Sequence, residues 1–258
     1  TAFAVDDAYP STYTYNYDYW GDVRESPDAY RMDQVIYSSA LGLEVAMKRP
    51  QSLFVQGQDL YVCDTGNNRI LQIGFADGEY TLTRVIDTRQ GVEPANLNTP
   101  GDVNVDKDGN IYIADTNNNR IVVLDRYFKV MFEISEFIND QGIDDKLNKP
   151  QGVFVTADTI WVCDTDQNRI VTFDREGNFI KIIPQPTSSL FDENAVYKPV
   201  AMAVDDYNRL YVVSSTTYQG VIVLTSDGQF TGFIGAQAVT ISAWEIIWRR
   251  FQTEEQQE

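Results

Sequence analysis

The chain has 258 residues, 43% of them hydrophobic, so it is long enough to bury one large core or two ordinary ones. Its 38 acidic and 20 basic residues give a net charge of −18, which repels nucleic acid and anionic membrane surfaces. The absence of histidine excludes Ser-His-Asp, Cys-His and His-ligated zinc chemistry within the chain. No run of about eighteen apolar residues occurs, so no segment is expected to span a bilayer.

The chain begins "TAFAVDDAYP", in which Ala2, Phe3 and Ala4 match the small-x-small pattern that precedes signal-peptidase cleavage. We interpret Thr1 as lying near the end of a removed signal peptide, with a chance tripeptide as the alternative. Residues 1–11 then form a post-signal segment. The expected location is extracytoplasmic, at the cell surface or associated with a membrane.

The stretch "YTYNYDYWGDV" alternates strictly, which places Tyr13, Tyr15, Tyr17 and Tyr19 on one face of a strand. The stretch "AYRMDQVIYSSALGLEVAMKRP" follows and predicts a further strand, then a loop into Pro50. Residues 12–47 are therefore predicted to be the second half of a four-stranded unit.

Four later segments begin with a proline, at intervals of 50, 50 and 49 residues: Pro50, Pro100, Pro150 and Pro199. Each predicts a short apolar strand, a polar turn, a second strand, an "xNNR"-type loop, and two more strands. Short alternating strands separated by Gly, Asn and Asp indicate antiparallel meanders, and four strands per repeat is the unit of a β-propeller blade. The sequence thus predicts an all-β propeller of four-stranded antiparallel blades. The predicted domain is 12–235, with a half blade at 12–47 and blades at 48–97, 98–147, 148–196 and 197–235.

The loops after the second strands repeat one motif: "DTGNNRI", "DTNNNRI" and "DTDQNRI". The aspartate is expected to accept backbone N–H bonds from the turn that follows, and the arginine five residues later to return a charge-assisted bond. A motif present in several repeats indicates a structural clasp rather than a catalytic site. The fourth unit has Ser214 in place of the aspartate, so it lacks the clasp. The clasp residues are Asp64 and Arg69, Asp115 and Arg120, and Asp164 and Arg169.

The segment "NTPGDVNVDKDGNIYIADTNNNRIVVLD", from Asn98 to Asp125, resembles the NHL repeat, and the resemblance extends from Lys48 to about Gly235. Propellers of this family commonly have six blades, so the resemblance implies that these units are part of a six-bladed ring. The stretches "YTYNYDYWGDVRESPDAY" and "GFIGA…WRRF" are also similar to bacterial extracytoplasmic NHL proteins fused to a Yip1-type membrane domain. That likeness implies an exported propeller whose membrane tether lies beyond residue 258.

Residues 236–258 are predicted to form an amphipathic helix and a polar tail. Ser242 and Glu245 have the spacing of a capping box. One helical stripe is formed by Trp244, Ile247, Trp248 and Phe251. The alternative to an incomplete ring is a complete, irregular one that uses this helix as a plug.

The loops after the second strands and the loops between blades are expected to share one face of a propeller, where binding usually occurs. The amide-rich surface suits a protein, peptide or glycan ligand, although turn formation alone also selects Asn. The candidate binding residues are Asn67, Asn68, Asn118, Asn119, Gln167, Asn168, Thr217 and Tyr218, of which the asparagines also suit positive-φ positions.

No catalytic residue and no cofactor is predicted, with calcium left open. The stretch "DKDGN" opens like a calcium loop, which makes Asp106 and Asp108 weak candidates, but a D-G hairpin turn explains it better. The residues expected near the channel, on or beside the inner strands, are Gln51, Asp102, Asn104 and Gln151. Cys63 and Cys163 lie in different blades, too far apart for a disulfide, and are predicted to be buried thiols.

The predicted function is a non-catalytic, extracytoplasmic binding or scaffold module of a membrane-anchored protein. The alternative is a calcium-dependent enzyme similar to lactonase propellers, with its site in the channel. An RNA-binding propeller needs a basic face, and the acidic excess argues against it.

Overall fold

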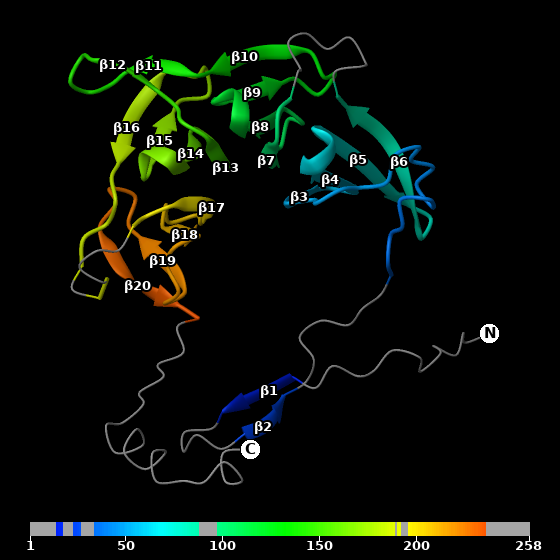
Figure 1. The fold of residues 1–258 in the computed structure, drawn as a ribbon, viewed down its shortest axis with the longest axis horizontal. Helices are drawn as coiled ribbons and strands as arrows, with labels where there is room; N and C mark the ends of the chain where they lie inside the picture. Colours follow the sequence, from blue (N-terminus) through cyan, green and yellow to red (C-terminus); the bar gives the residue numbers. More distant parts are fainter. Residues whose placement is uncertain are drawn as a thin grey trace. The chain divides into compact units, whose positions relative to one another are not determined.

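The computed structural model describes residues 34–87, 97–188, 190–191 and 196–235, and the backbone of residues 14–17 and 23–26 (Figure 1). Within these residues the regular structure consists of β-strands and short 3₁₀ helices. The chain divides into two compact units, residues 1–43 and residues 44–258.

The first unit contains a β-hairpin. Strands β1 (Thr14–Tyr17) and β2 (Val23–Ser26) pair antiparallel, with Tyr17 opposite Val23. The strand predicted from the tyrosine alternation is thus present over these four residues, while Tyr13 and Tyr19 lie outside the described part. The further strand expected before Pro50 is not formed by residues 34–50. Hydrogen bonds such as Leu41 N–H to Tyr37 O close turns there instead, and Gly42 takes a φ of 67°.

The second unit contains four sheets of four strands, each an antiparallel meander in chain order, which confirms the predicted fold class. Each sheet is one propeller blade. The first blade comprises β3 (Ser52–Gln56), β4 (Asp59–Asp64), β5 (Arg69–Ala76) and β6 (Glu79–Ile86). The second comprises β7 (Pro100–Val105), β8 (Ile111–Asp115), β9 (Arg120–Leu124) and β10 (Val130–Ile134). The third comprises β13 (Pro150–Val155), β14 (Ile160–Asp164), β15 (Arg169–Phe173) and β16 (Phe179–Ile183). The fourth comprises β17 (Pro199–Val204), β18 (Leu210–Ser214), β19 (Val221–Leu224) and β20 (Phe230–Ile234).

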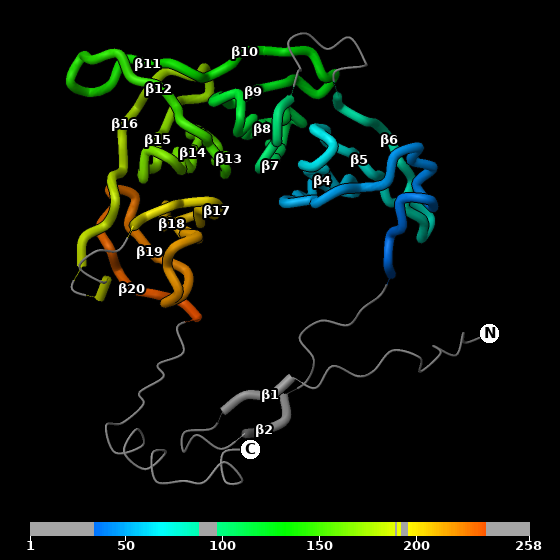
Figure 2. Tube along the Cα trace, viewed as in Figure 1, coloured from blue at the N-terminus to red at the C-terminus, as the bar shows by residue number. Residues whose placement is uncertain are grey.

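Successive blades pack face to face through their alternating apolar residues. The first strands β3, β7, β13 and β17 contact one another in this order, and Figure 2 shows the second to fourth blades each running from such an inner strand to an outer one. The core between the first two blades joins Cys63 and Ile70 to Val103 and Ile113, and the next two interfaces repeat this arrangement. Burying an Ile or Val side chain contributes about 1.5–3 kcal/mol, so each interface is held mainly by apolar contact.

A second, smaller hairpin stands between the second and third blades, and the sequence did not predict it. Strands β11 (Glu136–Ile138) and β12 (Asp144–Lys146) form their own two-stranded sheet in the linker between β10 and β13. Phe137 anchors the hairpin on the third blade, because its ring stacks on Phe179 with centroids 5.2 Å apart and meets Phe173 edge-on.

The predicted C-terminal helix, with Ser242 and Glu245, lies outside the described residues. Within the described ranges, no helix has the length and hydropathy needed to cross a membrane. Cys63 and Cys163 are both buried free thiols, as predicted.

Candidate functional site

The Asp–Arg pairs of the repeated motif are short in all three copies, with a buried aspartate and an arginine that is 10–13% exposed. Each aspartate is fully buried at the end of its second strand, and its Oδ2 accepts a hydrogen bond from the arginine Nε. Each arginine opens the third strand, directly opposite its aspartate in the sheet. The Nε–Oδ2 distances are 2.6 Å for Arg69–Asp64, 2.7 Å for Arg120–Asp115 and 2.8 Å for Arg169–Asp164.

The second oxygen of each aspartate has a different partner from the expected one. It accepts no bond from the turn that follows, and instead binds the backbone N–H of the segment that leads into the same blade. The antiparallel sheet places that segment beside the end of the second strand, so the clasp closes the blade through its entering chain. The donors are Lys48 N for Asp64, Asn98 N for Asp115 and Asn148 N for Asp164, each at 2.7 Å.

The loop asparagines have two different roles, whereas the sequence suggested that all of them occupy positive-φ positions. Asn68, Asn119 and Asn168 have φ values of 54°, 55° and 57°, as the left-handed position requires. Asn67 and Asn118 do not. Their Nδ2 groups each donate to the clasp aspartate at 2.8 Å, so these side chains complete the carboxylate's bonds.

The threonine after each aspartate joins one blade to the next, a role the sequence analysis missed although "DT" occurs in all three motifs. Its buried Oγ1 donates to the carbonyl of the proline that begins the following blade. A buried hydroxyl that crosses an interface fixes the relative register of the two blades. The pairs are Thr65 with Pro100 O (2.8 Å), Thr116 with Pro150 O (2.8 Å) and Thr165 with Pro199 O (2.6 Å).

The interface between the third and fourth blades lacks another hydrogen bond, one that a loop asparagine forms at the first two interfaces. Asn68 and Asn119 accept the N–H of the residue before the next proline, at 2.8 and 2.9 Å. The equivalent Oδ1 of Asn168 is buried without a partner among the described residues. At this interface the residue before the proline, Lys198, instead donates its N–H to Ser214 Oγ at 3.0 Å. Ser214 thus keeps one bond of the missing clasp.

The loops after the second strands lie against the segments between blades, as the bond from Gly66 N to Lys48 O illustrates. We call this surface the Asn face. Two adjoining hollows flank the β11–β12 hairpin on it. One, of about 720 Å³, is lined by the six residues of the two strands and by Gln167. The other, of about 400 Å³, includes Asn118, Asn119 and Glu136.

Ion pairs fix the hairpin in place beside these hollows. Asp145 binds Arg169 through two bonds of 2.7 and 2.8 Å, so the clasp arginine of the third blade also holds β12. The bonds from Arg169 hold the pKa of Asp145 down, at about 2. Outward from this contact, Glu136, Ile138 and Asp144 are exposed.

The candidate binding residues differ in whether their side chains are already bonded within the fold. The side chains of Asn67, Asn68 and Asn119 are used within the fold, as described above, and Asn118 also holds the clasp. Gln167 lines the larger hollow. In the fourth blade Tyr218 is 94% exposed, and Thr217 closes the local turn through its N–H to Ser214 O. The structure brings Asn118, Asn119 and Gln167 to one hairpin and leaves Thr217 and Tyr218 in another blade.

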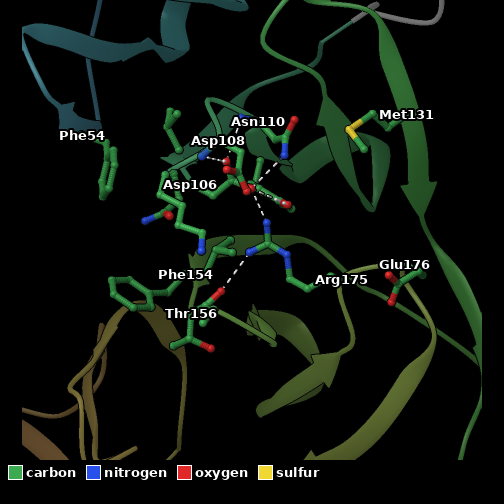
Figure 3. A pocket seen from close by; sticks show the side chains of 15 residues that line it. Phe54, Asp106, Asp108, Asn110, Met131, Phe154, Thr156, Arg175 and Glu176 are labelled. Atoms are coloured by element: carbon green, nitrogen blue, oxygen red, sulfur yellow. Dashed lines mark hydrogen bonds and ion pairs between the residues drawn. The ribbon is translucent and has the colours of Figure 1, made fainter.

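A pocket of about 570 Å³ opens on the opposite side, which we call the turn face because it is formed by the turns within blades. Figure 3 shows Phe54 and Phe154 at one side of this turn-face pocket and Met131 at the other. Between them Arg175 of the third blade forms an ion pair with Asp106 of the second and donates to Thr156 O at 2.8 Å. This pair fixes the walls of the pocket across two blades.

Asp106 is already saturated with donors, which bears on the calcium hypothesis. Its Oδ1 accepts the N–H groups of Asp108 and Asn110, and its Oδ2 accepts bonds from Asn110 Nδ2, Tyr112 and Arg175. Burial alone would raise its pKa, but the Asn110 bonds and the Arg175 charge hold that pKa below its ordinary value. The segment forms a D-G hairpin turn with Gly109 at a φ of 83°. An ion bound through Asp106 would therefore have to displace Arg175, so the contacts of Asp106 do not favour a calcium site there.

Asp102, on the inner strand β7, connects three blades. Its carboxylate accepts the hydroxyl of Ser52 from the first blade, and the N–H groups of Val103 and of Val153 in the third blade, both at 2.9 Å. Burial raises its pKa to about 6 despite these bonds. A carboxylate engaged in this way has little capacity left for a channel metal.

Comparison with known proteins agrees with this architecture. Residues 97–124, from the segment before β7 to the end of β9, match the NHL repeat family model. No curated protein sequence matches the chain at a significant level.

Two solved structures share the fold at low sequence identity. A streptogramin B lyase structure aligns with a TM-score of 0.52 and 18% identity over 86% of this chain and 62% of its own. Hydrazine synthase of Kuenenia stuttgartiensis aligns with a TM-score of 0.51 and 14% identity over 71% of this chain and 48% of its own. The chain thus spans less than two thirds of either protein. At this identity the likeness concerns the fold, and it identifies the chain as a β-propeller protein that contains an NHL repeat.

Proposed function

We propose that this chain is a non-catalytic binding module whose ligand is an extended, basic segment of a partner protein. The observation that carries the proposal is the larger hollow on the Asn face, between the β11–β12 hairpin and Gln167. The hairpin is an addition to the repeat pattern and is held rigidly by Phe137 and Asp145. Binding sites are commonly such additions on a rigid scaffold.

The charge of the hollow favours a basic ligand over a neutral glycan. Glu136 and Asp144 are exposed carboxylates with no ion-pair partner within the described part of the chain, and Lys146 is the lining residue of opposite sign. The net charge of −18 adds a long-range field that attracts basic partners and speeds their association.

The backbone of the hairpin favours an extended ligand. Leu147 N bonds to Ser135 O and Asn139 N to Ile143 O, so the alternation of an antiparallel ladder directs the N–H and C=O of Glu136 and Ile138 outward. An extended peptide can add to such an unpaired edge as a further strand.

Fluorescence anisotropy tests the proposal with two labelled decapeptides, one alternating Lys and Val and the other Glu and Val. We expect the Lys peptide to bind, and the Glu136→Gln/Asp144→Asn variant to bind it roughly tenfold more weakly, equivalent to about 1.4 kcal/mol. The control Glu79→Gln/Asp206→Asn changes the net charge equally at exposed positions in other blades, and should bind within about twofold of wild type. Equal weakening by both variants, or binding on a glycan array in place of the peptide, would overturn the proposal.

We also propose that this module is exported and tethered to a membrane by sequence beyond residue 258. The Ala2-Phe3-Ala4 pattern and the likeness of the N-terminal stretch to extracytoplasmic NHL proteins support this. The lactonase-like alternative receives no support from Asp102, whose oxygens bind groups of all three neighbouring inner strands.

A further inference from the structure

The turn-face pocket is lined by an amide side chain that forms no hydrogen bond within the described part of the chain. Asn104, in the middle of β7, is only 4% exposed, and its side chain forms no hydrogen bond with any described residue. Largely buried polar side chains are normally paired within the protein. The amide atoms of Asn104 are instead accessible from the pocket, where water or a ligand can bind them. Asn104 lines the pocket, so the missing partner has space to bind there.

Two phenyl rings line the same pocket from the positions equivalent to Asn104 in the neighbouring blades. Phe54, Asn104 and Phe154 occupy the same register position in three successive blades, opposite Tyr61, Tyr112 and Trp161 of the second strands. Phe54 and Phe154 both line the pocket, one from each neighbouring blade, and Figure 3 shows them on the same side of it. Aromatic walls around one polar group are typical of a site for a flat molecule.

The pocket also holds one cation that the fold does not use. Arg175 is committed to Asp106 and to Thr156 O. Lys107, in the β7–β8 turn, lines the pocket, and its ammonium has no partner among the residues described. An anionic group on a ligand would find its counter-charge at Lys107, while the carboxylates of Asp108 and Glu176, which also line the pocket, restrict where that group can lie.

We propose that the turn-face pocket is a small-molecule site for a planar cyclic amide or heteroaromatic compound that carries a carboxylate. The Asn104 amide offers one acceptor and one donor group and reads the complementary edge of the ring. Phe54 and Phe154 contact its apolar surface, and Lys107 binds the carboxylate. The volume of about 570 Å³ lies within the range of known ligand pockets. This site is on the opposite face from the peptide site and does not depend on it.

Three probes separate these contributions in ligand-observed NMR titrations. Uracil-6-carboxylate has both the amide edge and the carboxylate, uracil lacks the carboxylate, and benzoate lacks the amide edge. We expect uracil-6-carboxylate to bind at least about tenfold more tightly than either of the others, because each of them loses one polar contact.

Two substitutions assign the contacts. Lys107→Ala should weaken uracil-6-carboxylate about tenfold and leave uracil unchanged, whereas Asn104→Leu should remove the preference over benzoate. Lys129→Ala, an equal charge change on the same blade outside the pocket, is the control and should bind like wild type. Thermal melting checks that Asn104→Leu folds; if it does not, Phe154→Leu replaces it and should weaken all three probes. Absence of binding by uracil-6-carboxylate at 10 mM (roughly the weakest affinity expected of a fragment), or equal effects of Lys107→Ala and Lys129→Ala, would overturn the proposal.

Discussion

At the scale of the residue, the clasp aspartate gains its importance from being buried with both carboxylate oxygens hydrogen-bonded. Asp115 is fully buried and binds Asn98 N, Asn118 Nδ2 and Arg120 Nε. Removing its carboxylate would leave Arg120 Nε and the Asn98 N–H without their acceptor, while Arg120 would keep its ion pair with Glu133. Asp115→Ala is therefore expected to lower the free energy of unfolding by about 3 kcal/mol, measured by urea denaturation.

The fourth blade provides the control for this prediction. Ser214 stands in the aspartate position and still accepts Lys198 N. Asp115→Ser should therefore keep the bond to Asn98 N and cost clearly less than Asp115→Ala. Equal losses in the two variants would mean that the arginine, and not the entering chain, determines the contribution of the clasp.

At the scale of the element, Asp102 couples the inner strands β3, β7 and β13 in a way that depends on pH. Its folded-state pKa of about 6 lies above the ordinary value of 3.8, so the folded protein takes up the proton at a higher pH than the unfolded chain. Ionised Asp102 therefore opposes folding above pH 6, and this unfavourable contribution disappears as the pH falls from 6 towards 4.

The comparison of wild type with Asp102→Asn isolates this effect. Between pH 7 and pH 4 the unfolding free energy of wild type should shift upward relative to the variant, by at most about 3 kcal/mol. Groups whose pKa is lowered in the folded state, such as Asp145, contribute less to the free energy of unfolding as the pH falls. This loss is the same in both proteins and cancels in the difference. Parallel pH profiles for the two proteins would show that Asp102 does not titrate in this window.

At the scale of the whole molecule, the first and last described blades expose apolar faces that the inner blades bury. Leu53 is 66% exposed whereas its equivalent in the second blade, Val103, is 1% exposed. In the fourth blade Ile234 is 53% exposed, against 3% for Ile134. Exposed apolar sheet faces of this kind usually mark an interface, so we expect further strands to cover them in the native ring.

The mass of the protein as its own cell makes it tests this expectation together with the proposed tether. We expect an intact mass well above 29.3 kDa, in the membrane fraction. A mass near 29.3 kDa in the soluble fraction would contradict both, and a second copy of the chain would become the favoured cover for Leu53 and Ile234.

Sequence reasoning was sufficient where a signal repeats and insufficient where contacts are specific to one place. The prolines at regular intervals and the alternating strands predicted the four-stranded blades, because each blade follows the same local rules. The β11–β12 hairpin occurs in only one of the described linkers between blades, so no periodicity in the sequence could predict it. The pocket that Asn104 lines is built from residues of three blades, among them Phe54 and Phe154, and no spacing within one repeat predicts that arrangement. The regular repetition of the motif also concealed that Asn67 and Asn68 have different roles.

The altered hydrogen bonds between the third and fourth blades have a consequence for how the protein loses its structure. Asn168 Oδ1 has no described partner at the third interface, and Ser214 replaces a clasp there. Since each blade of a repeat protein is stabilised mainly by its neighbours, a weaker interface divides the array into cooperative units. On heating, the fourth blade should separate while the three clasped blades persist, so the protein would melt in two steps with an intermediate that still carries both proposed binding sites.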